Sequence, residues 1–288
     1  MHFSLGNSFP IFLALSISAC ATAPRPGSGA GRDDSRPAAT PVPSSAPGPW
    51  SFSPAVGTRA YRVSRNASIE GVTDSAVRRE VVSNFTHEIL TLEQAGEEMS
   101  FRVVIDTFAV ITQGPIEPAQ IAELPIQLTG SLGMGGVRVE TPASDSCDPV
   151  RATVAADIHN LLAPAPSQLS RGAVWRDAIT TTGCQAGIPT TATTRRTFTV
   201  AGEVAYCGRP HLLVQRVDSV NARGEGANGQ HRMTVEGTGA GSALYYLETA
   251  SGEVSRLTTN QRIRITVTTS GRLHSFTQTT NQEFVLVR

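Results

Sequence analysis

Histidine, serine and carboxylate side chains perform much of protein catalysis and metal binding, and this chain spaces them in no catalytic pattern. Its six histidines are scattered, whereas zinc and iron ligands often lie about three to five residues apart on one element. Ser131, in Gly-Ser-Leu-Gly, misses the G-x-S-x-G spacing of a nucleophile elbow. Glu97 and Glu98 are adjacent, so on a strand they would point to opposite faces and could not flank one substrate bond. We therefore expect no catalytic residue, no metal and no cofactor, and we predict that the chain is not an enzyme.

Two glycine-rich segments, residues 130–136 and 237–241, raise the question of a phosphate-binding loop. Neither is followed by Lys-Ser or Lys-Thr, and neither opens a helix whose N-terminus could hold an anion. Gly237, Gly239 and Gly241 occupy alternate positions and so face one side of a strand. Glycine at such positions is typical of a kink or of close approach by another element. We expect these strands in a sharply curved part of a sheet.

Cys20 stands where an apolar segment ends. Residues 10–19 are apolar but too few to cross a bilayer as a stable helix, and their length suits the apolar region of a signal peptide. The sequence Ile17-Ser18-Ala19-Cys20 resembles the lipobox of bacterial lipoproteins, in which the cysteine receives diacylglycerol before cleavage. The resemblance implies a signal peptide over residues 1–19 and a mature N-terminus at a Cys20 that carries lipid, with acyl chains such as palmitate.

The alternative for Cys20 is an ordinary signal peptide with a small-residue cleavage site beside an incidental cysteine. Lipidation is favoured because Cys20 falls where the apolar run gives way to a segment that cannot pack a core. Ala21 follows it, which resembles the outer-membrane sorting class of Gram-negative lipoproteins. The expected address is the cell envelope, lipid-anchored at the outer membrane and facing the periplasm or the cell exterior.

Residues 20–50 form the next predicted segment, a disordered tether. They are rich in Pro, Ala, Ser and Gly and contain no Ile, Leu, Phe or Met. Such a segment buries too little apolar surface to offset its chain entropy. As a flexible coil it would span roughly 30 Å on average, so the body that follows would be held off the membrane without being fixed to it.

Three cysteines remain after Cys20 is assigned to lipid, so an oxidising compartment leaves one bridge and one further thiol. Cys147 and Cys184 both lie in segments that contain Gly, Pro or Ser, on either side of one predicted helix. We favour a disulfide between Cys147 and Cys184, with Cys207 left over. All three pairings stay open at this point.

Period-two alternation is the main structural signal along the body. Phe101, Val103 and Ile105 share one face of a predicted strand, with polar Arg102 on the other face. Similar runs recur near residues 198–206 and 262–268, and Ala95-Gly96, Ser251-Gly252 and Ser270-Gly271 supply short turns between runs. The pattern predicts a mainly β protein, with an antiparallel meander that has one covered face and one wet face.

One helix is predicted over residues 149–162. Asp148 suits its N-cap and Pro149 its first position, and apolar residues recur at helical spacing before Pro164. The apolar stripe is expected on the sheet, and His159, on the opposite side, is expected in solvent. The pairs Arg78-Arg79 and Arg195-Arg196 are interpreted as solubilising charge at strand starts.

The two halves of the body share features at offsets near 115 residues, including these arginine pairs. We infer a duplicated meander with a first β unit over residues 51–141, a helix-containing connector over 142–171 and a second β unit over 172–288. Convergent β composition is the alternative explanation. Together the units are expected to form a strongly curved sheet or half-barrel with one central amphipathic helix.

The formal net charge is zero and basic residues are scattered, which excludes a polybasic face for nucleic acid. With its lipobox Cys20, Pro-rich stalk and repeated amphipathic strands, the chain resembles lipid-anchored envelope proteins of bacteria. Its architecture is similar to that of the outer-membrane lipoprotein carriers, whose curved antiparallel sheet covers an apolar cavity. The resemblance implies a non-enzymatic protein that binds a lipid or another hydrophobic ligand in a concave sheet. The alternative is a structural or protein-interaction module of the envelope, with a filled core.

Overall fold

The computed structural model describes residues 48–51, 55–73, 76–96, 98–113, 124–133, 136–140, 148–163, 165–185, 187–228 and 231–287. All of them belong to the second of two compact units, residues 39–288. The predicted signal peptide, Cys20, most of the tether and Cys147 lie outside the described residues, so the statements about them remain predictions.

The described residues form thirteen strands and one helix. The chain order is β1 (Trp50–Ser51), β2 (Gly57–Thr73), β3 (Ala76–Ala95), β4 (Glu98–Gln113), β5 (Ile126–Gly133), β6 (Gly136–Glu140), α1 (Pro149–Leu161), β7 (Gln168–Leu169), β8 (Val174–Gln185), β9 (Ile188–Tyr206), β10 (Arg209–Asn228), β11 (His231–Glu248), β12 (Val254–Thr269) and β13 (Arg272–Val287).

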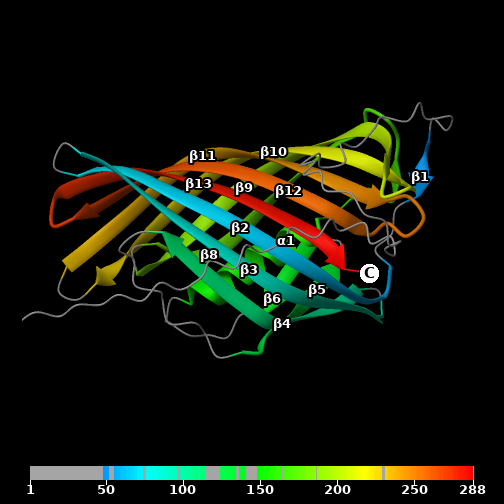
Figure 1. The fold of residues 1–288 in the computed structure, drawn as a ribbon, viewed down its shortest axis with the longest axis horizontal. Helices are drawn as coiled ribbons and strands as arrows, with labels where there is room; N and C mark the ends of the chain where they lie inside the picture. Colours follow the sequence, from blue (N-terminus) through cyan, green and yellow to red (C-terminus); the bar gives the residue numbers. More distant parts are fainter. Residues whose placement is uncertain are drawn as a thin grey trace, which may run out of the picture. The chain divides into compact units, whose positions relative to one another are not determined.

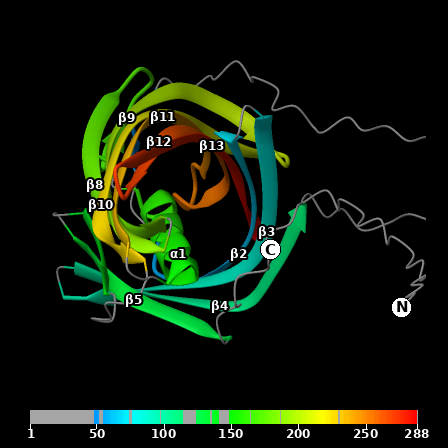
Figure 2. The same cartoon turned by 90° about the vertical axis from the view of Figure 1, so that its left-hand side faces the viewer.

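Eleven of these strands make one antiparallel sheet in the order β6-β5-β4-β3-β2-β13-β12-β11-β10-β9-β8. It consists of two meanders, β2–β6 and β8–β13, which are joined where β13 pairs with β2. Strands β1 and β7 form a separate two-stranded ribbon. Figures 1 and 2 show the long strands crossing the body obliquely and curving around α1. The predicted fold class, a strongly curved mainly β sheet with one helix, is confirmed.

Side chains alternate between the two faces of the sheet as the sequence indicates. Tyr61 and Val63 of β2 are buried on the concave side, whereas Arg62 and Asn66 are exposed on the convex side. The short turns also form where glycine was expected. Gly96 and Gly271 have positive φ values of 66° and 78°, a conformation that suits glycine in a tight turn.

The alternate glycines of β11 lie where neighbouring strands approach closely. A Cβ atom built on Gly239 would stand 2.3 Å from the carbonyl oxygen of Arg262 in β12. Any side chain at this position would therefore push the two strands apart. The glycine pattern has a structural role, as expected.

Helix α1 begins as the sequence indicates, because the Asp148 carboxylate accepts hydrogen bonds from the backbone N–H groups of Val150 and Arg151, both 3.0 Å long. Its apolar stripe, which includes Val154, Ile158 and Leu161, belongs to the main buried cluster of the sheet. Figure 2 shows α1 inside the curve of the strands rather than on their outer surface.

The position of the helix corrects the prediction for His159. This residue is only 7% exposed, because the strands curve around the helix and cover both of its flanks. The expectation of a solvated histidine is wrong. In the part of the chain that the structure describes, no helix is long and apolar enough to cross a membrane.

Candidate functional site

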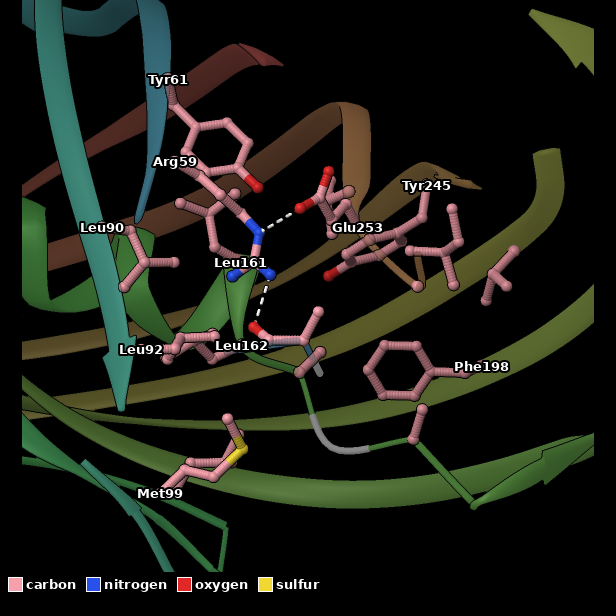
Figure 3. Close-up of a pocket in the computed structure, with 18 of the residues that line it drawn as sticks. Arg59, Tyr61, Leu90, Leu92, Met99, Leu161, Leu162, Phe198, Tyr245 and Glu253 are labelled. Atoms are coloured by element: carbon pink, nitrogen blue, oxygen red, sulfur yellow. Dashed lines mark hydrogen bonds and ion pairs between the residues drawn. The ribbon is translucent and has the colours of Figure 1, made fainter. Parts of the chain in front are cut away.

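An apolar cavity of about 370 Å³ lies inside the curved sheet at the C-terminal end of α1. Figure 3 shows leucine and aromatic side chains pointing into it from strands of both meanders and from the helix. The aliphatic part of the lining includes Leu90, Leu92, Leu161, Leu162 and Val214. Strand alternation places Leu90, Leu92 and Val214 inward, and the end of α1 brings Leu161 and Leu162 against them.

Aromatic rings form a second part of the lining. The ring of Trp175 stacks on Phe198 with centroids 4.9 Å apart and an interplanar angle of 2°, and Phe198 meets Tyr245 at 6.1 Å. Such rings offer large, rigid apolar surfaces at little entropic cost. The rings therefore give the cavity a large and rigid apolar wall.

One ion pair interrupts this apolar lining. The Arg59 Nε donates to the Glu253 carboxylate at 2.7 Å, and its Nη2 donates to the carbonyl oxygen of Ala55 at 2.5 Å. The Arg59 side chain is 7% exposed and that of Glu253 is 24% exposed. Figure 3 shows this pair beside the cavity, where it forms a polar part of the lining.

Three buried arginines, Arg196, Arg216 and Arg65, contact α1 beside the apolar cavity. Arg196 of β9 donates to both carboxylate oxygens of Asp177, at 2.7 and 2.5 Å, and its Nη1 donates to the carbonyl oxygen of His159 at 2.8 Å. That carbonyl lies in the last turn of α1, where no later residue of the helix supplies a backbone donor. Arg196 therefore caps the helix, and its charge complements the negative end of the helix dipole.

Arg216 of β10 makes a parallel set of contacts. It donates to Asp218 at 2.9 Å, to the side-chain oxygen of Asn160 at 2.8 Å and to the Tyr245 hydroxyl at 2.5 Å. The Tyr245 hydroxyl in turn donates to the Asn160 carbonyl at 3.2 Å. Burial acts to lower the pKa of Arg216, but Tyr245 and Asp218 outweigh it, so this pKa is raised.

Arg65 of β2 is the third buried arginine that contacts α1. It pairs with Glu88 of β3 at 3.0 Å and with Asp157 of α1, which also accepts a hydrogen bond from Gln282. Burial raises the pKa of Glu88, although Arg65 and Thr86 act in the opposite direction. Burial also lowers the pKa of Arg65 against the opposing effect of Glu88.

His159 lies close to two of these buried charges, Arg196 and Asp177. Burial lowers its pKa, Arg196 lowers it further and Asp177 opposes the change. Its Nδ1 is buried without a hydrogen-bond partner. The neutral imidazole is the form that this environment favours.

Two more cavities adjoin the helix. One, of about 430 Å³, is lined by polar and apolar side chains of β8–β13, by Arg65 of β2 and by α1 residues that include Ala152 and Asn160. The other, of about 560 Å³, lies between the edge strands β6 and β8, which no backbone pairing joins in the described residues. Trp175 and Ala165 line both this side opening and the apolar cavity.

The buried arginines were missed by the sequence analysis. Arg196 was interpreted as solubilising charge, yet it is 1% exposed and lies within β9 rather than at its start. The sequence did contain a signal that Arg196 is buried, because Arg196 lies on the same face of its strand as the apolar residues Phe198 and Val200. Arg65 follows Tyr61 and Val63 in the same way. The interpretation holds for Arg195, which is exposed.

The two described cysteines are far apart in the fold. Cys184 lies beside the β8–β9 hairpin and Cys207 in the β9–β10 turn, so the length of β9 separates them. Neither is a free thiol, so the expectation that Cys207 is left over is wrong, and they cannot share one bridge. The Cys147–Cys184 bridge remains a prediction, because Cys147 lies outside the described residues.

No model of a protein family matches the chain, and no curated protein matches it. Among solved structures, Pseudomonas aeruginosa OpdQ aligns over 80% of this chain and 99% of its own, with 6% identity and a TM-score of 0.26. Pseudomonas aeruginosa OccK2 (OpdF) aligns over 80% and 98%, with 8% identity and a TM-score of 0.24. The described residues also contain no group of three or more His, Cys, Asp or Glu side chains that could hold a metal ion.

Proposed function

We propose that this chain is a lipid-anchored, non-enzymatic protein of the bacterial envelope that binds a hydrophobic ligand inside its curved sheet. The observation that carries the proposal is the apolar cavity of about 370 Å³ between α1 and the strands. Ligand pockets in proteins usually have volumes of about 300–1,000 Å³ and a mostly apolar lining with a few polar groups. This cavity has those properties.

The lining favours an amphiphile with an apolar chain and a compact polar group. Leu90, Leu92 and the stacked Trp175–Phe198 pair would take the chain. The Arg59–Glu253 pair would take the polar group, since it offers both a donor and an acceptor. The side opening between β6 and β8 would give such a ligand access, because Trp175 lines both spaces.

Occupancy of the cavity can be measured through tryptophan fluorescence. The chain has two tryptophans, and Trp175 lines the cavity whereas Trp50 lies in β1. A fatty acid brominated along its chain quenches only a tryptophan that it contacts. We expect it to quench the emission of the W50F variant, which retains Trp175, and to leave the W175F variant nearly unquenched.

A matched pair of substitutions tests where the ligand lies. Ala163→Trp adds an indole to the cavity lining, and Ala240→Trp adds one to the exposed face of β11. With a dansyl-labelled fatty acid as the probe, A163W should bind at least about tenfold more weakly, and A240W should bind like the wild type. Absence of binding to the wild type, or equal binding by both variants, would support the envelope interaction module instead.

The membrane anchor rests on Cys20 and has its own test. Expressed in a Gram-negative host, the mature chain should begin at Cys20 and carry the mass of diacylglycerol and an amide-linked acyl chain. Cys20→Ser should release the protein from the membrane fraction. A mature N-terminus elsewhere, with an unmodified Cys20, would contradict the anchor but not the cavity.

A further inference from the structure

The polar cavity on the other side of the helix is a second candidate site. It has a volume of about 430 Å³ and is lined by strands β8–β13, by Arg65 of β2 and by residues of α1. Leu161 and Leu162 line the apolar cavity, whereas Ala152, Asp157 and Asn160 line the polar one. We propose that this polar cavity binds a neutral carbohydrate, independently of the hydrophobic ligand.

Uncharged hydrogen-bonding side chains are the most numerous kind in the lining contributed by the strands, where they alternate with apolar side chains. Thr181, Thr194, Thr259, Gln261 and Gln278 are among them. Each hydroxyl or amide can donate and accept hydrogen bonds, as the hydroxyl groups of a sugar do. A ligand rich in hydroxyl groups therefore matches this surface better than an acyl chain.

Buried charges at the floor of the cavity balance one another. Arg65, Arg196 and Arg216 are paired with Asp157, Asp177 and Asp218. Glu88, which also pairs with Arg65, does not line the cavity. No surplus charge remains to select an anionic or a cationic ligand, so a neutral one is favoured.

One buried acceptor on the floor still needs a donor. The Asp218 side chain is 3% exposed, and its Oδ2 accepts hydrogen bonds from Arg216. Its Oδ1 is buried with no hydrogen-bond partner, and Asp218 lines the cavity. Leaving a buried carboxylate oxygen unpaired is unfavourable, so a small shift of Asp218 toward the cavity would let it accept a hydrogen bond from a hydroxyl group of the ligand.

Gly241 of β11 packs closely against Asp218. A Cβ atom on Gly241 of β11 would lie 3.3 Å from Asp218 Oδ2 and 2.9 Å from the carbonyl oxygen of Asn260. An alanine here would press on Asp218 and on the β12 backbone, so the absence of a side chain at position 241 keeps the carboxylate in place. Val220 and Ile263, which also line the cavity, offer apolar contacts to the C–H face of a sugar ring.

The test uses the full chain and saturation-transfer NMR with a panel of neutral sugars: glucose, galactose, N-acetylglucosamine, maltose and chitobiose. Glucuronate serves as the charged comparison. We expect at least one neutral sugar to receive saturation from the protein, and more strongly than glucuronate does. Transfer to none of the five, or stronger transfer to glucuronate, would overturn the proposal.

Two variants of β9 place the binding in the cavity. Ala192→Phe introduces a ring into the lining, and Thr191→Phe introduces one at an exposed position next to it. A192F should weaken sugar binding at least about tenfold, and T191F should not. Equal binding by the two variants would overturn the assignment to this cavity.

The result of the sugar-binding experiment can be distinguished from the result of the fatty-acid experiment. Brominated fatty acid should quench Trp175 equally in A192F and in the wild type, because Ala192 does not line the apolar cavity. This retained signal also shows that A192F is folded. Loss of both signals in A192F would contradict the independence of the two sites.

Discussion

Removing the carboxylate of Asp177 should test whether the buried arginines hold the helix in place. In Asp177→Ala, Arg196 loses two hydrogen bonds and its counter-charge while its side chain, 1% exposed, remains buried. Breaking a buried ion pair in this way costs about 3–5 kcal/mol. Asp177 is itself 16% exposed and adjoins the side opening, where water can partly replace it. We therefore expect a loss near the lower limit, about 3 kcal/mol.

That loss is measurable by chemical or thermal unfolding. For a domain of this size, 1 kcal/mol corresponds to about 2–4 °C in Tm, so D177A should melt about 6–12 °C below the wild type. Glu225→Ala provides the control, because its ion pair with Arg232 has side chains that are 70% and 90% exposed. E225A should change the free energy of unfolding by about 0.5 kcal/mol or less.

A double-mutant cycle isolates the pair. Arg196→Met fills a similar volume without charge, and the combined variant R196M/D177A leaves no buried arginine unpaired. The two single losses should exceed the loss of the double variant by about 1–3 kcal/mol. Additive losses, or a D177A variant as stable as E225A, would refute the role of this pair.

Three further predictions concern individual residues. Because the pKa of His159 is lowered in the folded chain, the unfolded chain binds a proton that the folded one excludes, and stability should fall as the pH drops below about 6.5. Urea unfolding at about pH 7 and pH 5 should show a smaller loss in H159L than in the wild type, and an equal loss would contradict this. Gly239→Ala should destabilise by about 1–3 kcal/mol because its Cβ meets backbone, whereas Gly183→Ala, whose Cβ meets nothing within 4 Å, should be nearly neutral in thermal melts. Peptide mapping without reduction should recover Cys147 linked to Cys184, and a peptide linking Cys184 to Cys207 would contradict their placement at opposite ends of β9.

Much of the fold could be predicted because it depends on local interactions. Alternation in the strands, glycine at the turns and the Asp148 cap of α1 each reflect the conformational preferences of a few adjacent residues. The same alternation predicted a sheet with one apolar face. It could not predict which leucines and aromatic rings would meet at the apolar cavity, because they come from strands far apart in the chain.

The sequence by itself therefore determined the strands, the helix and the candidate lipid site at Cys20. Only the tertiary structure decided that β13 pairs with β2, and so that the two meanders form one sheet. It also decided that α1 lies inside the curve, which buries His159 and makes Arg196 a cap for the helix instead of a surface charge. The physical reason is that neighbouring residues set the backbone conformation of each segment, whereas the burial of a side chain depends on how the whole sheet packs.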